Sequence, residues 1–437
     1  MVSACTCFFD GAALATGIHI MYFSFSGRLG RRALSLCLAF ITTMQAHALT
    51  LDQALTEAGR QAPSLAAQVA DRQAARSAAI PAGELPDPRV TLGLQNLPIQ
   101  GDAAWDVNAE RMTMQRIGLM QEVPSRAKRE ARVELAQAGI ALADAQQSVE
   151  LLDVQQATTQ AWISTLAVER KLVVFRQLYA ENRLFAKAVE ARLAGGRGLA
   201  ADSVGPREEA ATLADREDQL LREEIQMRAQ LRRWVGDFAA QQLSGGWPQW
   251  PVDAERYRDN LQRHPQLEVF DPLQRQAEAR VDGALAEKKP DWSWGLDYLR
   301  RSREFGDMVS LNVTFDLPVF SASRQDPAID AERAGLARVY AQREAVVRLY
   351  RLELTDELAE YQRLERTLVR SEQTLLPLAE EKVGLAMTDY RAGKGELGGV
   401  IVAREQLIAV RLRHIDLTRD RSLSNARLHF AFGADRP

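Results

Sequence analysis

The chain has few residues that could carry covalent or metal chemistry. It has only three cysteines, all near its start: Cys5, Cys7 and Cys37. A mature chain that begins after residue 48 would therefore have none, which excludes disulfides, thiolate metal sites and a cysteine nucleophile. The later histidines stand far apart in the sequence: His264, His414 and His429. We expect neither enzymatic activity nor a metal or other cofactor site.

Beyond residue 48 the chain also lacks an apolar stretch of about 18 residues, which argues against a membrane-spanning helix. A net charge of −3 argues against nucleic acid as a partner. Residues 1–48 are typical of an export signal with a possible extra N-terminal extension. A basic patch before residue 33 precedes a short apolar run, Ala33–Met44, and the small-x-small sequence Ala46-His47-Ala48. We expect cleavage after Ala48.

The remaining chain contains an internal duplication. Residues 190–208 and 387–405 align at one fixed offset, so that Gly196-Arg197-Gly198 matches Gly393-Lys394-Gly395. The repetition predicts two copies of one helix-strand-strand-helix-helix unit, at 49–236 and 264–437. Residues 237–263 would join them as an equatorial linker.

Long helices dominate each predicted repeat. Ser125–Leu193 has no proline and a single glycine, and its apolar residues step by three and four as in a coiled coil. The matching stretch, 328–390, contains Pro377, which we expect to bend the helix and act as a hinge. Glycine-containing tips at 194–202 and 391–399 lead into second helices at 203–236 and 398–431, and shorter helices at 50–79 and 265–288 open the two repeats.

Strand-like segments lie between the helices. Residues 291–300 and 308–317 alternate apolar and polar side chains over about ten residues, the length of a tilted transmembrane strand. A weaker pair is expected at 89–95 and 111–121. Taken alone, these pairs fit a soluble hairpin equally well, but the export signal and flanking helices favour a membrane. Four aromatic residues would then lie near the membrane interface: Trp292, Trp294, Tyr298 and Phe315.

Four strands cannot cross a membrane alone, because the two sheet edges would leave peptide groups unpaired in lipid. Three copies would supply twelve strands. We therefore expect a mainly α fold with a small membrane β part, in which a homotrimer forms a 12-stranded β-barrel and a long periplasmic α-helical barrel.

Several motifs resemble those of the TolC-type outer-membrane efflux protein family, most closely its heavy-metal (CzcC-like) branch. They are weak singly, but occur in the family's order over most of residues 49–433: Leu51-Asp52-Gln53-Ala54-Leu55, Pro86-Asp87-Pro88, Gln121-Glu122-Val123-Pro124, Asp316-Leu317-Pro318 and Tyr390-Arg391-Ala392-Gly393.

The resemblance implies a trimeric outer-membrane duct that docks a periplasmic membrane-fusion (adaptor) protein and an inner-membrane resistance-nodulation-division pump. It assigns docking and gating to residues at the hairpin tips: Gly196, Arg197, Gly198, Asp202, Tyr390, Arg391, Gly393, Lys394, Gly395 and Glu396. At the family's acidic-ring positions this chain has Gly399 and Val402. Asp202 or Glu396 could replace the ring, although solvated surface charges explain both residues.

The resemblance further implies passive export, with heavy-metal cations as the substrate class. Two alternatives remain open at this point: the outer-membrane duct of a type I secretion system, and a periplasmic coiled-coil adaptor or scaffold.

Overall fold

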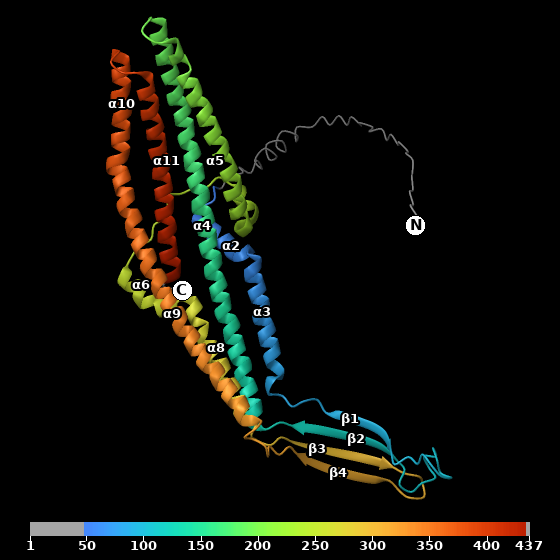
Figure 1. Ribbon diagram of the computed structural model, residues 1–437. Coiled ribbons are helices and arrows are strands. Elements are labelled where there is room, and N and C mark those ends of the chain that lie inside the picture. Colours follow the sequence, from blue (N-terminus) through green and yellow to red (C-terminus); the bar gives the residue numbers. More distant parts are fainter. Residues whose placement is uncertain (1–47, 434–437) are drawn as a thin grey trace, which may run out of the picture. The chain divides into compact units, whose positions relative to one another are not determined.

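A computed structural model describes residues 48–433, as a mainly helical unit with one small sheet (Figure 1). The predicted export signal and the three cysteines lie outside these residues. Two long hairpins, one from each repeat, run side by side and end together, and the sheet lies at the opposite end of the helices (Figure 1). Within residues 48–433, no helix is both long and apolar enough to cross a membrane.

Helix α4 (Arg126–Ala194) is the longest element, at 69 residues. At about 1.5 Å per residue it extends about 100 Å. The Ser125 side chain caps its first turn by accepting a hydrogen bond from the Lys128 amide. Helices α3 (Pro63–Ala79) and α8 (Phe270–Ala286) pack against its half near the sheet, and α5 (Gly205–Val235) packs against its other half (Figure 1).

In the second repeat the long helix is continuous, but its hydrogen bonding is irregular just before Pro377. Helix α9 (Gln325–Arg370) passes through one π-helical turn, Ser371–Leu375, into α10 (Leu376–Ala392). Proline has no amide hydrogen for the preceding turn, and the wider π turn absorbs this missing bond. Helix α11 (Leu397–Leu428) returns antiparallel to α10 and ends in a second π turn, His429–Gly433.

The prediction of one unbroken helix over 50–79 is wrong. Helix α2 (Leu51–Gln61) ends at Ala62, whose backbone is extended, and α3 starts at Pro63. Proline disfavours the helical conformation in the preceding residue, which explains the break. The predicted helix 265–288 is likewise divided, into α7 (Pro265–Glu268) and α8. Pro272, in the first turn of α8, cannot donate to a preceding turn.

The four strands form one antiparallel sheet in the order β1-β2-β3-β4. Their bounds are β1 Arg89–Gln95, β2 Met114–Val123, β3 Trp292–Arg300 and β4 Met308–Phe315. Strand β2 begins three residues later than expected, after a turn in which Asn96 bonds the Met112 carbonyl. The central pairing, β2 with β3, joins the two repeats, so each repeat contributes one hairpin.

The register sorts the side chains of the sheet onto two faces. One face, here called the apolar face, carries Val90, Leu92, Leu94, Ile117, Leu119, Trp292, Trp294, Leu296, Tyr298, Val309, Leu311, Val313 and Phe315. Most of these residues are exposed, and Leu92 and Leu311 reach 72% and 70%. Gln115, Gln121, Val123 and Arg300 share this face by register. The opposite, polar face carries the other strand residues, among them Arg116, Asp297 and Asn312.

The segment 237–263 packs against the middle of the helices. It contains a short 3-10 turn, Gly236–Ala240, and helix α6 (Ala254–Asn260). Leu49 pairs with Leu243 in a parallel bridge, and the buried Trp162 of α4 donates its indole N–H to the Leu49 carbonyl at 3.3 Å. Trp247 and Trp250 cover the same hydrophobic cluster. The start of the described chain and the linker are thus fixed to α4.

Candidate functional site

The first hairpin tip follows the end of α4. Gly196 has φ +70°, a left-handed conformation that glycine adopts without steric cost. The Arg192 guanidinium reaches forward to the Arg197 carbonyl at 2.9 Å and so closes the turn. Asp202 lies in the short 3-10 turn Ala200–Ser203 and accepts a hydrogen bond from the Leu199 amide at 3.2 Å.

The second tip is built in the same way. Gly393 ends α10 in the left-handed conformation with φ +77°, and the Lys394 amide bonds the Asp389 carbonyl at 2.9 Å. At Gly395 a side chain would meet Asp389 at 3.2 Å, so the turn is tight. Lys394 and Glu396 point into solvent.

The two tips meet at Tyr390, which is only 2% exposed. The Arg192 guanidinium lies 4.0 Å from the centre of its ring in a cation–π contact. Burial, and then the Asp202 carboxylate, raise the pKa of Tyr390. An apolar cluster of Phe185, Val189, Leu397 and Val400 lies next to the tyrosine. The predicted residues Asp202 and Tyr390, from different repeats, are therefore brought together.

The other residues predicted for docking have no such contact between repeats. Gly196, Arg197, Gly393 and Arg391 are exposed at the ends of the hairpins, and Gly198 is partly buried beside Leu193. Pro377 lies in the first turn of α10, about four helical turns before Gly393 and directly after the π turn described above. Gly399 and Val402, at the positions of the family's acidic ring, are both exposed.

One buried ion pair behind the tips escaped the sequence analysis. Arg404 of α11 and Glu209 of α5 form a bidentate pair, with nitrogen–oxygen distances of 2.8–3.1 Å. Their side chains are only 8% and 4% exposed. Arg404 also lies 5.1 Å from the ring centre of Phe185 on α4. The duplication aligned Arg404-Glu405 with Arg207-Glu208, but sequence spacing gave no reason to pair residue 404 with residue 209.

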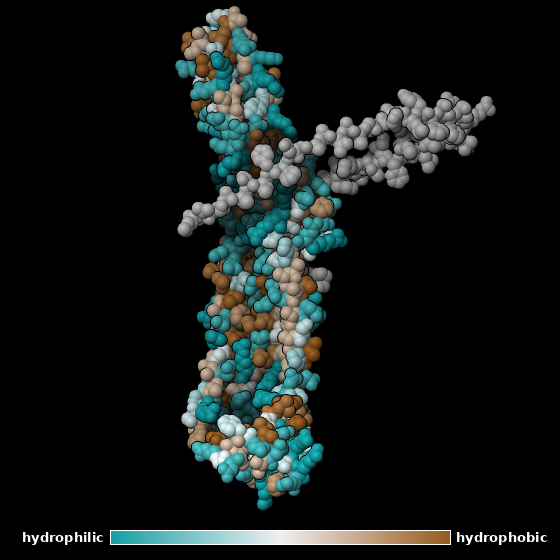
Figure 2. Space-filling view, turned by 90° about the vertical axis from the view of Figure 1, so that its right-hand side faces the viewer, coloured by the Kyte–Doolittle hydropathy of each residue, from teal (hydrophilic) through white to brown (hydrophobic). Residues whose placement is uncertain are grey.

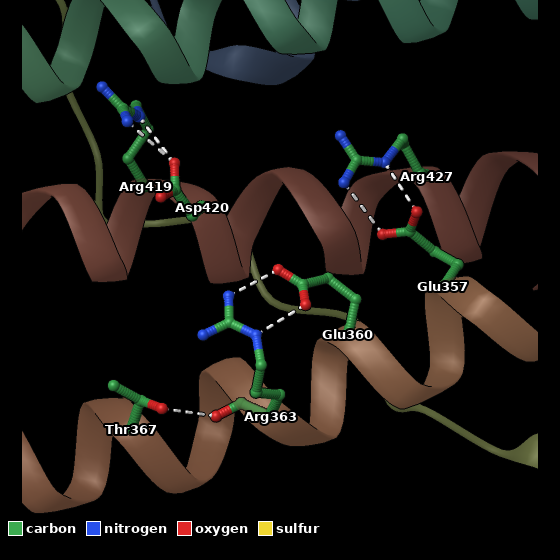
Figure 3. A network of polar contacts seen from close by, with 7 residues as sticks. All are labelled: Glu357, Glu360, Arg363, Thr367, Arg419, Asp420 and Arg427. Carbon is green, nitrogen blue, oxygen red and sulfur yellow. Dashed lines mark hydrogen bonds and ion pairs between the residues drawn. The ribbon is translucent and has the colours of Figure 1, made fainter.

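Further ion pairs connect the two hairpins along their length. Glu181 of α4 contacts Arg411 of α11 at 2.9 Å, and Lys171 contacts Asp416 at 2.7 Å. Burial by itself would lower the pKa of Arg411, but its hydrogen bonds to Glu181 and Glu380 and their negative charges outweigh burial, so this pKa is raised. Nearer the sheet, Arg427 of α11 forms two bonds to Glu357 of α9, while other charges pair within one helix (Figure 3). Ion pairs thus connect the helices of the two hairpins from the tips to the middle of the molecule.

The strands expose large apolar side chains, among them Leu92, Leu311 and Phe315. Hydrophilic and hydrophobic residues are intermixed on the helices in the view of Figure 2. The four predicted interface aromatics all fall on the apolar face, with Trp292, Tyr298 and Phe315 exposed by 40%, 42% and 60%.

Among residues 48–433, no group of three or more His, Cys, Asp or Glu side chains is arranged to hold a metal ion. The histidines have other neighbours. His429 stacks on Trp250 at 4.7 Å between ring centres, His264 packs on Tyr350 at 4.0 Å, and His414 contacts the Ser371 hydroxyl.

The comparisons with known proteins agree with this architecture. The profile of the family described as outer membrane efflux protein matches residues 257–434. No curated protein matches the chain. Among solved structures, a membrane protein from Pseudomonas aeruginosa superposes with a TM-score of 0.77 at 18% identity, over 88% of this chain and 90% of the other.

Two further structures share the fold. The outer membrane protein VceC from Vibrio cholerae superposes with a TM-score of 0.73 at 18% identity, over 88% of this chain and 96% of its own. CusC, whose structures are described in relation to transmembrane channel formation, gives 0.68 at 17% identity, over 88% and 92%. At sequence identities of 17–18%, the similarity to these structures establishes the fold alone.

Proposed function

We propose that this chain, whose residues 257–434 match the model of the outer membrane efflux protein family, is a member of that family and the subunit of a passive homotrimeric channel. Its sheet would span the outer membrane, and its helices would extend through the periplasm to an adaptor and an inner-membrane pump. The duct would carry out no chemistry of its own. Energy and substrate choice would come from the pump.

The observation that carries this proposal is a sheet with two open edges and one exposed apolar face. Strands β1 and β4 are its edges, with no further strand beside either in the described chain. In lipid, unpaired backbone groups cost several kcal/mol each, so the edges require partners. Three copies, each pairing its β4 with the next copy's β1, would close twelve strands with the apolar faces outward. The polar faces would then line a water-filled lumen.

We further propose that the hairpin tips form the docking and gating end. The exposed residues Arg197, Arg391 and Lys394 offer an adaptor positive charge. The contacts around Tyr390 and the Glu209–Arg404 pair would hold the tips together until docking. The π turn before Pro377 would supply a compliant point.

Heavy-metal cations are the substrate class that we propose, on the strength of the sequence motifs. A strain that lacks this chain should become sensitive to the exported metal, and the intact gene should restore resistance. Unchanged tolerance to every metal tested, together with loss of an exported protein, would instead favour the type I secretion duct.

Two measurements test the channel itself. The detergent-extracted protein should have the mass of three chains and should conduct ions across a planar lipid bilayer. A water-soluble monomer without conductance would favour the periplasmic scaffold.

The gate has a separate test. Replacing Gly196 and Gly393 by proline forces φ near −65° where both need positive values. Export should be lost while membrane insertion continues, and normal export would contradict the gating proposal. The double variant Gly398→Ala/Gly399→Ala is a control, since neither position has a neighbour within 4 Å of an added methyl group.

A further inference from the structure

A charged cluster crosses the centre of the sheet on its polar face. Asp297 of β3 accepts two hydrogen bonds from the Arg116 guanidinium of β2, at 2.7 and 2.9 Å. It also accepts one from the Asn312 side chain of β4 at 3.1 Å. Arg116 and Asp297 are 181 residues apart in the chain, and β2 and β3 are the two central strands (Figure 1).

A glycine of β2 provides space for this cluster. Gly118 lies directly opposite Asp297 in the β2–β3 register, and a methyl group there would lie 2.1 Å from the carboxylate oxygen. Gly93 lies opposite Arg116 in the β1–β2 register. The carboxylate therefore occupies the volume that a side chain at position 118 would otherwise fill.

The two charges differ in their access to solvent. The Asp297 side chain is 7% exposed, whereas that of Arg116 is 39% exposed. The acid lies against the sheet, and the guanidinium covers it. The other charged residues on the polar face of the strands, Arg89 and Glu122, contact each other at 3.5 Å. Within the described strands, each charge on this face therefore has an opposite charge beside it.

We propose that the Arg116–Asp297–Asn312 cluster sets the charge preference of the pore. It would form a ring of three self-neutralised pairs, and this ring keeps the lumen open to solutes of either charge. The inference rests on the proposed function, because the polar face lines a lumen only in the closed trimer.

The dimensions of such a lumen allow the ring to act on passing ions. Twelve strands about 4.8 Å apart and tilted by about 40° enclose a backbone radius of about 12 Å. A unit charge about 10 Å away in water changes the local concentration of a monovalent ion by about twofold. The Debye length is about 30 Å at 0.01 M salt but about 3 Å at 1 M. The effect of a ring of unpaired charges on ion permeability should thus be measurable at low salt and absent at high salt.

Reversal potentials across a planar bilayer, under a KCl gradient near 0.01 M, test the proposal. Asp297→Asn leaves three arginines without their carboxylates and should raise the anion-to-cation permeability ratio by at least about twofold. Arg116→Gln leaves three carboxylates and should shift the ratio by a similar factor in the opposite direction. The double variant should return towards the wild-type value.

Two controls accompany these variants. Arg300→Gln removes a charge from the same strand β3 but on the opposite face, so it should leave the ratio unchanged. Arg116→Lys keeps the charge and should preserve the wild-type preference even if Arg116→Gln fails to insert. At 1 M KCl all the ratios should converge.

The outcomes separate this inference from the channel proposal. Conducting channels whose ratio is the same in wild type, Asp297→Asn and Arg116→Gln would overturn the inference and leave the channel standing; if Arg116→Gln does not insert, an unchanged ratio in Asp297→Asn alone has the same meaning. Shifts of the same sign in Asp297→Asn and Arg116→Gln would also overturn it. A wild-type protein that never conducts would overturn the proposed function, and the inference with it.

Discussion

The helical hairpins should be strongly destabilised when either partner of the buried pair between Glu209 and Arg404 is removed alone. Removing one partner of a buried ion pair leaves an uncompensated charge and costs about 3–5 kcal/mol. The exposures of 8% and 4%, and the bidentate geometry, place this pair in that class. We therefore expect Glu209→Ala and Arg404→Ala each to lower the free energy of unfolding by about 3–5 kcal/mol.

The double variant Glu209→Ala/Arg404→Ala separates the pair from its surroundings. Because the second substitution removes a charge that the first left unpaired, the two effects should fall short of additivity by about 1–3 kcal/mol. Replacing both residues by methionine should be neutral, or stabilising by up to about 4 kcal/mol, since no charge is then buried.

The measurement is denaturant unfolding in detergent, followed by far-ultraviolet circular dichroism at one fixed protein concentration, because assembly alters apparent stability. The matched control is Arg363→Ala, which breaks the exposed pair with Glu360 on α9, where the side chains are 55% and 41% exposed. Such surface pairs contribute about 0–1 kcal/mol. An Arg404→Ala effect no larger than that of Arg363→Ala, or strict additivity in the double variant, would refute the reasoning.

Three further predictions concern the sheet, the helices and the π turn. Gly118→Ala should reduce assembly and heat resistance, because its methyl group would collide with Asp297. Gly93→Ala, with no neighbour within 4 Å, should be tolerated. Gel electrophoresis of the heated assemblies compares the two variants. Burial, the larger cause, and the hydrogen bond to Glu217 on α5, the smaller one, together raise the pKa of Tyr179 to about 12. The unfolded chain therefore loses the Tyr179 proton near pH 10, while the folded chain still keeps it. Stability should fall between pH 10 and about 12, and Tyr179→Phe should lessen the fall in melting temperature over that range; an identical fall would count against this pair. Pro377→Ala restores an amide hydrogen and should stabilise the α9–α10 helix by at most about 3 kcal/mol. If the π turn assists gating, the Pro377→Ala channel should also open less often in a planar bilayer.

Local sequence patterns determined most of the elements of this chain. The alternation at 308–317 reflects the period of two that any strand with two different faces must have, and β4 is found at Met308–Phe315. The absence of proline from 125–193 allowed one continuous helix, which the structure places at Arg126–Ala194. The left-handed glycines of the tips follow from the same local chemistry, since glycine tolerates positive φ and other residues rarely do.

Local patterns predicted helix boundaries less reliably near prolines that have helix-forming sequence on both sides. The helix expected over 50–79 is divided at Ala62, and the one over 265–288 is divided before Phe270. Proline is well tolerated in the first turn of a helix, and the apolar periodicity continues on both sides of it. Periodicity alone therefore did not show that one helix ends and another begins at these places.

The contacts that matter most for the proposed function were decided by the tertiary structure. The duplication showed that both tips exist, but not that Tyr390 would lie between Arg192 and Asp202. The pairing of Arg116 with Asp297 depends on which strand lies beside β2, and the link between Glu209 and Arg404 depends on how two helices pack. Sequence periodicity specifies which side of an element is apolar, because that depends on backbone geometry alone. It does not specify which charged residue will lie opposite another, because that depends on registers that only the packed chain fixes.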